Sequence, residues 1–293
     1  MSNSIGFIGL GIMGGPMSVN LAAAGYDVAG YDVHRPALAQ LTAAGGRACD
    51  RIADAVADAD VVITMLPDSP QVEEVVLGED GVLDNAKPGT LLIDMSTIRP
   101  ETSRRVAALG STRCLRVLDA PVSGGQQGAI DGTLSIMAGG EEKDFHAASG
   151  IFEVLGKTVV HVGPHGAGQT VKAANQLVVG GIYALVAEAI VLLEASGVDA
   201  GAGLEVLAGG LAGSRILELK RKSMVAREFQ PGFRIDLHHK DMGIVLAAAR
   251  EAEVALPVGA LTAQLIGAAR AQGDGGLDHS GLLRVVERLS GRG

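Results

Sequence analysis

The chain of 293 residues has no tryptophan, 3% aromatic residues and two cysteines. So few rings leave little material for a surface that stacks nucleic-acid bases or for an aromatic carbohydrate platform. The net charge of −9 disfavours binding to a phosphate backbone, so we expect no nucleic-acid partner. Cys49 and Cys114 have no metal-binding spacing, and we expect both to be buried, reduced thiols.

Long apolar runs are also lacking. The longest one, 177–187, ends at Glu188, short of the roughly 20 residues that a membrane span requires. The first residues have neither the basic region nor the cleavage site of a signal peptide. We therefore expect a cytoplasmic protein without membrane association. What the chain has in excess is glycine, with 42 residues, a composition that favours tight turns and close backbone approaches.

Two patterns divide the chain. Up to residue 163, short apolar runs alternate with helical patterns, the order of repeated strand–helix–strand units in a doubly wound, mainly parallel sheet. Beyond residue 163, apolar residues recur at spacings of three and four residues, a pattern that predicts helices and no strands. Strands are predicted at 4–8, 27–31, 61–65, 90–94, 115–119, 134–138 and 158–161.

One predicted helix is much longer than the others. It covers 169–196 and is closed by Gly197. At about 1.5 Å per residue it is roughly 40 Å long, which exceeds one small domain. The pattern therefore predicts an α/β Rossmann domain over 1–163, a connecting long helix over 164–196 and an all-α domain over 197–293.

A glycine-rich turn separates the first predicted strand from the helix that follows it. It has the spacing Gly-x-Gly-x-x-Gly and consists of Gly9, Leu10, Gly11, Ile12, Met13 and Gly14. In this context the glycines allow a tight turn, close approach of a pyrophosphate, and packing of helix on strand. Asp32 follows at the end of the second predicted strand, where a carboxylate accepts hydrogen bonds from ribose hydroxyls.

The residues after Asp32 leave the choice of dinucleotide open. Asp32 would repel a 2′-phosphate and favours NAD. Arg35 could instead pair with such a phosphate, which favours NADP. The alternative for Arg35 is an exposed residue at a helix start.

Two further turns follow predicted parallel strands. Leu66 and Pro67 end one, and Ser96 and Thr97 end the next. Ligands bind beyond the carboxyl ends of such strands, so we expect both turns to face the cofactor. The alternative for Ser96 and Thr97 is capping of the helix that begins near Pro100.

A hydroxyl and two glycines come after another strand. Ser123, Gly124 and Gly125 offer an Oγ and unshielded backbone N–H groups, which suit a carboxylate. The alternative is an ordinary glycine turn.

Polar residues share one face of the long helix. Lys172, Asn175 and Gln176 are spaced i, i+3 and i+4. A lysine beside an amide suits proton transfer at a hydroxyl or carbonyl oxygen, although most helical lysines are solvated.

Lys240 and Asp241 form a further charged pair in the helical region, and the alternative for them is a surface ion pair. The neighbouring His238 and His239 would point about 100° apart on a helix and make poor joint ligands. We therefore predict no metal site.

Four motifs together resemble the β-hydroxyacid dehydrogenase family, in family order and with similarity over essentially the whole chain. They are 6–14, 119–125, 166–176 and 240–241. The resemblance implies a Rossmann domain, a long connecting helix and an all-α domain, with the active site in the cleft between them. It also implies NAD or NADP as cofactor, a small carboxylate-bearing aldehyde or hydroxyacid as substrate, and a homodimer or homotetramer.

The resemblance implies roles for individual residues as well. Lys172 would be the acid/base residue, and Asn175 would position it or the substrate. Ser123, Gly124 and Gly125 would hold the carboxylate. Thr97 and Lys240 would contact the cofactor or the substrate.

Within the family, several segments are most similar to tartronate semialdehyde (2-hydroxy-3-oxopropionate) reductases. They are 129–134, 209–214, 231–238 and 278–280. This similarity implies reversible reduction to D-glycerate and a place in glyoxylate metabolism. Alternatives are the 3-hydroxyisobutyrate dehydrogenases, other short 3-hydroxyacid dehydrogenases and a nucleotide-binding regulatory homologue without turnover. Arg35 is displaced relative to the reductase pattern, so the cofactor choice stays open.

Overall fold

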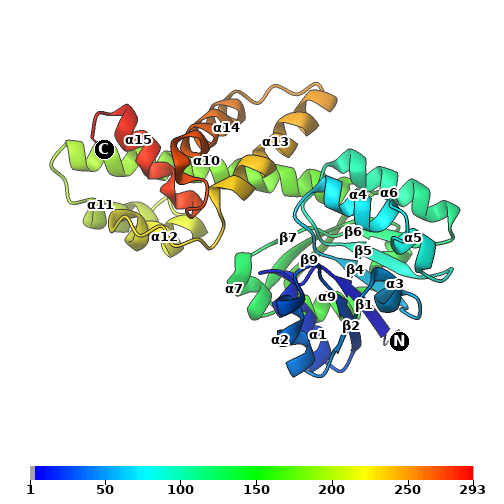
Figure 1. The fold of residues 1–293 in the computed structure, drawn as a ribbon. Helices are drawn as coiled ribbons and strands as arrows, with labels where there is room; N and C mark the ends of the chain where they lie inside the picture. Colours follow the sequence, from blue (N-terminus) through cyan, green and yellow to red (C-terminus); the bar gives the residue numbers. More distant parts are fainter. Residues whose placement is uncertain (1–3, 293) are drawn as a thin grey trace. The chain divides into compact units, whose positions relative to one another are not determined.

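A computed structural model describes residues 4–292, and its contacts divide the chain into two compact units, Met1–Lys172 and Ala173–Gly293 (Figure 1). The division falls inside the long helix α10 (Ala167–Ala195). The three-part domain division made from the sequence, with a first boundary at residue 163, stays a prediction.

The first unit is built on a nine-stranded sheet with the order β3-β2-β1-β4-β5-β6-β8-β7 and β9 paired to β8. Every pairing from β3 to β6 is parallel, whereas β8 runs antiparallel to β6 and β7. This parallel order is that of dinucleotide-binding domains, and it confirms the predicted fold. The strands are β1 (Ser4–Ile8), β2 (Asp27–Tyr31), β3 (Arg47–Ala48), β4 (Val61–Thr64), β5 (Leu91–Asp94), β6 (Arg116–Asp119), β7 (Val122–Ser123), β8 (Leu134–Gly140) and β9 (Gly156–Gly163).

Helices cover both faces of this sheet (Figure 1). Successive strand side chains alternate between two cores: Ile5 and Phe7 belong to one, and Ile8 to the other. The first core includes α1 (Gly14–Ala23), α2 (Leu38–Ala43), α7 (Gly125–Ile130) and α9 (Ser149–Leu155). The second includes α3 (Ile52–Val56), α4 (Ser69–Leu77), α5 (Val82–Asn85) and α6 (Pro100–Thr112). The 3₁₀ turn η1 (Arg35–Ala37) precedes α2, and α8 (Glu142–Ala147) follows β8.

Two features of the first unit differ from the prediction. The strands β3 and β7 were not expected, because two residues are too few to show an alternating pattern. Cys49 is buried as expected, but the expectation for Cys114 was wrong, because its side chain is exposed. Cys114 lies in the turn between α6 and β6 with φ +58°, a backbone conformation that belongs to the turn and not to a core-facing strand.

The second unit is helical. Its core gathers apolar side chains from α10 and the helices after it, including Tyr183, Leu204, Met242 and Ile266. Among the residues described, its strand-like pairing is a single bridge between Arg234 and Asp278, so the predicted all-α character is confirmed. The helices are α11 (Ala200–Gly209), α12 (Arg215–Val225), α13 (Ile235–Glu251), α14 (Pro257–Ala269), η2 (Arg270–Asp274), η3 (His279–Leu282) and α15 (Leu283–Leu289).

Helix α10 begins two residues before its predicted start and ends one residue before its predicted end. Gly197, with φ +72°, follows it as expected. By length and composition alone this helix could cross a membrane, a property that core helices of soluble proteins share. Its residues Tyr183, Ala187 and Ile190 are buried in the second core, so the apolar character of α10 has a packing explanation.

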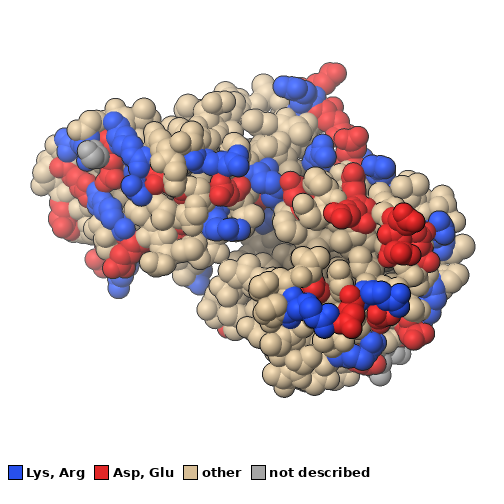
Figure 2. Space-filling model, viewed as in Figure 1, with Lys and Arg blue, Asp and Glu red and all other residues tan. Residues whose placement is uncertain are grey.

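Charged side chains of both signs are mixed on the face of each unit that Figure 2 shows. Ion pairs between opposite charges occur in both units, among them Arg51 with Asp54 and Arg215 with Glu218. A mixed distribution of this kind gives no extended field of one sign on the face in view.

Candidate active site

The glycine-rich turn lies at the end of β1, at the point where the strand order reverses between β1 and β4. Gly9 has φ +93°, and a Cβ there would collide with the Met65 carbonyl oxygen. A Cβ on Gly14 would collide with the Gly9 carbonyl oxygen, so helix and turn could not pack. A Cβ on Gly11 would meet nothing within 4 Å. The turn therefore leaves open space at the helix N-terminus, as a bound pyrophosphate requires.

Asp32 joins the end of β2 to this turn. One carboxylate oxygen accepts from the Leu10 N–H at 2.6 Å, and the other accepts from the His34 N–H at 2.7 Å. Arg35 is exposed and pairs with Asp50 at 2.5 Å. In this arrangement the guanidinium already has an acidic partner, and the carboxylate of Asp32 is the fixed charge at the strand end.

The turns after β4 and β5 are bonded to each other. The Leu66 N–H donates to Ser96 Oγ at 2.8 Å, while Pro67 is exposed beside it. The N-cap residue of helix α6 is Arg99, whose side chain makes no capping hydrogen bond. Neither Ser96 nor Thr97 is therefore the N-cap residue of this helix. Both turns lie at the carboxyl edge of the sheet, where ligands of such folds bind.

The turn at Ser123 has a backbone that requires glycine. Ser123 ends β7, and Gly124 and Gly125 follow with φ +142° and +64°. A Cβ on Gly125 would meet nothing within 4 Å. The short strand β7, which pairs with β8, fixes the Ser123 backbone, and the two glycines leave their N–H groups unshielded at the start of α7.

Lys172 is buried, with 7% of its surface exposed. Its Nζ donates to the Val122 carbonyl oxygen at 2.7 Å. The solvated alternative is therefore wrong for this lysine. Within the first unit, the Lys172 Nζ lies against the residue that precedes Ser123, so the predicted acid/base residue and the predicted carboxylate turn come together.

In the second unit a chain of polar contacts starts one helical turn further along α10. The Asn175 side-chain amide donates to Gln176 Oε1 at 2.8 Å, and the Gln176 amide donates to Asp241 Oδ2 at 2.5 Å. Lys240 pairs with the other oxygen of Asp241 at 2.9 Å. Because Asp241 is only 3% exposed, this is no surface ion pair. The structure thus links Asn175 and Lys240, which are distant in sequence.

The two adjacent histidines differ in burial, because His238 is buried and His239 is only partly buried. His238 is buried, and its ring contacts the Gln176 carbonyl oxygen and His279, each at 3.2 Å. Burial, followed by the nearby His238, lowers the pKa of His279 to about 3, so this ring stays neutral. Among residues 4–292 no three His, Cys, Asp or Glu side chains are grouped to hold a metal ion.

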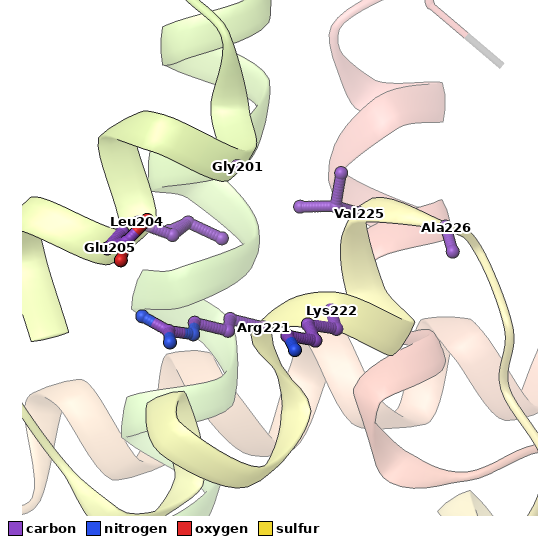
Figure 3. Close-up of a pocket in the computed structure, with 7 residues that line it drawn as sticks. All are labelled: Gly201, Leu204, Glu205, Arg221, Lys222, Val225 and Ala226. Atoms are coloured by element: carbon purple, nitrogen blue, oxygen red, sulfur yellow. The ribbon is translucent and has the colours of Figure 1, made fainter.

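A cavity of about 390 Å³ lies between α11 and α12 of the second unit. In Figure 3 the side chains of Leu204 and Val225 point toward each other across it. Arg221 and Lys222 extend from α12 at its edge (Figure 3). None of the residues predicted to bind cofactor or substrate lines this cavity. Its lining consists of Gly201, Leu204, Glu205, Arg221, Lys222, Val225 and Ala226.

The fold and the dinucleotide turn define a Rossmann oxidoreductase that uses NAD or NADP. Residues 4–163 match the family described as the NAD binding domain of 6-phosphogluconate dehydrogenase. Residues 166–286 match the NAD-binding family of NADP-dependent 3-hydroxyisobutyrate dehydrogenase. The chain belongs to the β-hydroxyacid dehydrogenases, the family of 3-hydroxyisobutyrate dehydrogenase, as the four sequence motifs predicted.

Relatives with different substrates are similarly close. The chain is 40% identical to 2-hydroxy-3-oxopropionate reductase of Escherichia coli, covering 98% of both chains. It is 38% identical to 3-hydroxyisobutyrate dehydrogenase of Pseudomonas aeruginosa, covering 96% of this chain and 97% of the other. A solved structure of Mycobacterium tuberculosis 3-hydroxyisobutyrate dehydrogenase with L-serine has a TM-score of 0.89 at 36% identity, covering 98% and 99%. The likeness therefore fixes the family and leaves the substrate open.

The structure also shows polar residues to which the sequence analysis gave no role. Asp119 and Gln169 of the first unit and Asp241 of the second are buried and bonded to neighbours of the predicted site. The sequence signal that could have revealed these residues is a polar residue inside an otherwise apolar motif. The hydrogen-bond partners of such a residue, however, depend on which strand ends meet in the fold.

Proposed function

We propose that the protein reduces tartronate semialdehyde to D-glycerate, reversibly, with NADH or NADPH as the reductant. The observation that carries this proposal is the 2.7 Å contact of Lys172 Nζ with the Val122 carbonyl oxygen. It holds a buried ammonium against the Ser123 turn, so a substrate whose carboxylate lies on the turn has its reacting oxygen near a proton donor. The tartronate-like segments at 129–134 and 231–238 favour this substrate within the family.

Different residues of the chain bind the substrate carboxylate and transfer the proton in the proposed reaction. The backbone N–H groups of Gly124 and Gly125, with Ser123 Oγ, bind the carboxylate. When bound, the reduced nicotinamide supplies the hydride. As the aldehyde carbon gains that hydride, the electron pair of the C=O π bond moves to oxygen, and Lys172 stabilises the charge and donates the proton. In the reverse direction neutral Lys172 removes the hydroxyl proton, and Asn175, three residues further along α10, orients the lysine or the substrate.

The cofactor fits the turn because Gly11 leaves space for its diphosphate. Residues 9–14 and Asp32 hold the dinucleotide, with Leu66, Pro67 and Thr97 at neighbouring strand ends and Lys240 from the helical unit. The carboxylate of Asp32 favours NAD, and the pairing of Arg35 with Asp50 supports the same preference.

A second candidate is oxidation of 3-hydroxyisobutyrate or another short 3-hydroxyacid. The similarity to 3-hydroxyisobutyrate dehydrogenases favours it. The mechanism would be the same, since a methyl in place of a hydroxyl changes only a few pocket contacts.

The test is a substrate panel that follows oxidation of the reduced nucleotide by absorbance. Tartronate, methylmalonate and succinate semialdehydes are each compared with NADH and with NADPH. We expect kcat/KM to favour tartronate semialdehyde at least tenfold, or about 1.4 kcal/mol at the transition state. Preference for methylmalonate semialdehyde would move the protein to the hydroxyisobutyrate branch. Absence of turnover despite tight nucleotide binding would support the regulatory homologue instead.

We also propose a cytoplasmic homo-oligomer that acts in glyoxylate metabolism. For the oligomer, the support is an apolar stripe on α10 within the second unit. Val178, Leu185 and Leu192 are 58%, 64% and 67% exposed, and their spacing of seven residues puts them on one side of the helix. A second copy of the chain would bury them.

A further inference from the structure

Gln169 lies one helical turn before Lys172 on α10 and is only 1% exposed. Its side-chain amide donates to the Ser96 carbonyl oxygen at 2.8 Å and accepts from the Ile98 N–H at 3.0 Å. Those two backbone groups are on either side of Thr97. The side chain therefore holds the backbone of this turn in the way that a paired strand would.

The backbone of Gln169 is bound on another side. Its N–H donates to one oxygen of Asp119 at 3.0 Å, and the Gly166 N–H donates to the other at 2.7 Å. Asp119 is the last residue of β6. The first turn of α10 is thus fixed to the end of β6 through its backbone and to the end of β5 through Gln169.

These contacts extend to the remaining turn of the sheet edge. The backbone carbonyl oxygen of Ser96 accepts from Gln169. The Oγ of the same residue accepts from the Leu66 N–H at 2.8 Å. Lys172, on the following turn of the helix, reaches Val122. Gln169 therefore joins the proposed cofactor turns to the helix of the proposed acid/base residue.

We propose that Gln169 is a positioning residue: it sets the place of the Ser96–Ile98 turn relative to Lys172. This role rests on the proposed function, because it requires a reaction in which the Ser96–Ile98 turn and Lys172 must be aligned. Hydride and proton go to adjacent atoms of one carbonyl group, and a misplacement of about 1 Å costs on the order of a hundredfold in rate. Gln169 does not itself have to touch either ligand.

Two variants separate this role from simple stabilisation. Q169L removes both side-chain hydrogen bonds with little change in volume. Q169E keeps the acceptor for the Ile98 N–H, but it donates to Ser96 only when its carboxyl is protonated. The matched control is T90V, which removes a buried bond of 3.0 Å from Thr90 Oγ1 to the Ala59 carbonyl oxygen, next to the opposite end of β5.

For Q169L we expect kcat to fall by about thirtyfold or more and nucleotide Kd, measured by calorimetry, to change less than about threefold. Hydrogen exchange at the Ile98 amide should become faster. T90V should lower the melting temperature, since it leaves a buried carbonyl unsatisfied, but its kcat should stay within about twofold of the wild type.

The ratio of Q169E to wild-type kcat should rise as pH is lowered, while the ratio of Q169L to wild-type kcat stays flat. Asp94, Asp119 and Lys172 face this region in every variant, so the flat Q169L ratio is the check that their own titration does not account for the Q169E change.

The role would be overturned if Q169L kept kcat within about threefold of the wild type, or if T90V lost as much activity. Should Q169L fail to fold, a Q169E ratio that does not change with pH would overturn it. An inactive wild-type protein would contradict the proposed function, whereas an active wild type with unaffected Gln169 variants would contradict only the role of Gln169.

Discussion

At the scale of single residues, Lys172 is the side chain on which the proposed chemistry depends most. We predict that K172A lowers kcat by at least about a hundredfold, because general acid/base groups contribute on the order of 10² to 10⁴ in rate. Nucleotide Kd should change little, since the glycine turn and Asp32 are untouched. Steady-state kinetics and calorimetry measure the two quantities.

The matched control for Lys172 is K157A, which removes an exposed lysine of the same unit. Its kcat should equal that of the wild type. A K172A enzyme with nearly normal turnover would exclude the acid/base role.

Ser123 is the residue that we propose to bind the substrate carboxylate. S123A removes one donor to the carboxylate, and a hydrogen bond to a charged group contributes about 1.5 to 3 kcal/mol. We expect KM for the semialdehyde to rise about tenfold or more with a smaller change in kcat. An unchanged KM would remove Ser123 from the site.

Asp32 is the residue that we propose to control the choice of dinucleotide. D32N removes the charge that would repel a 2′-phosphate and keeps an acceptor for the Leu10 N–H. The ratio of kcat/KM for NADPH to that for NADH should rise about tenfold, which is about 1.4 kcal/mol. D58N, an exposed aspartate variant, serves as control and should leave the ratio unchanged. If D32N also left it unchanged, Asp32 would not be the discriminating residue.

At the scale of elements, the carboxyl ends of β5 and β6 place two buried aspartates side by side. Asp94 and Asp119 are partners in the parallel register. Burial raises the pKa of Asp94 from 3.8 to about 6, against hydrogen bonds from Ser96 and Thr64, and burial also raises the pKa of Asp119. The charged form of Asp94 therefore costs folding free energy.

The sign of the pH dependence follows. Between pH 3.8 and about 6 the folded state binds more protons at Asp94 than the unfolded state, so its contribution to stability falls as pH rises and is constant above. The free energy of unfolding of D94N minus that of the wild type should increase by about 3 kcal/mol across this window. Chemical denaturation at several pH values measures it, with D58N as control. A constant difference would mean that Asp94 is ionised at its ordinary pKa.

At the scale of the whole molecule, the prediction concerns assembly. L185D puts a charge in the middle of the α10 stripe, and burial of an unpaired charge in a subunit interface is strongly unfavourable. We expect light scattering to show an oligomer for the wild type and a smaller species for L185D. L109D, on α6 of the first unit, is the control and should keep the wild-type mass. A monomeric wild-type protein would contradict the proposal.

Much of the fold followed from the sequence, because strands covered on both faces by helices have distinctive apolar runs. β1 and β2 were predicted with the same bounds that they have in the structure, and α10 was predicted to within two residues. Gly9 and Gly14 were predictable because a Cβ on either would collide with a backbone carbonyl oxygen, and Gly11 was predictable because a pyrophosphate must approach its backbone closely. The two-residue strands and the exposure of Cys114 were not predictable, since neither has a local periodic signal in the sequence.

The candidate site residues and their order along the chain could be predicted from the sequence, because hydrophobic periodicity, turn composition and motif spacing are local properties. Which of these residues meet depends on the packing of the fold. Lys172 reaches the Val122 carbonyl, and Gln169 joins the ends of β5 and β6, because parallel strands bring their carboxyl ends to one edge of the sheet. Hydrogen bonds between residues some fifty to seventy positions apart depend on that packing, and no local pattern encodes them.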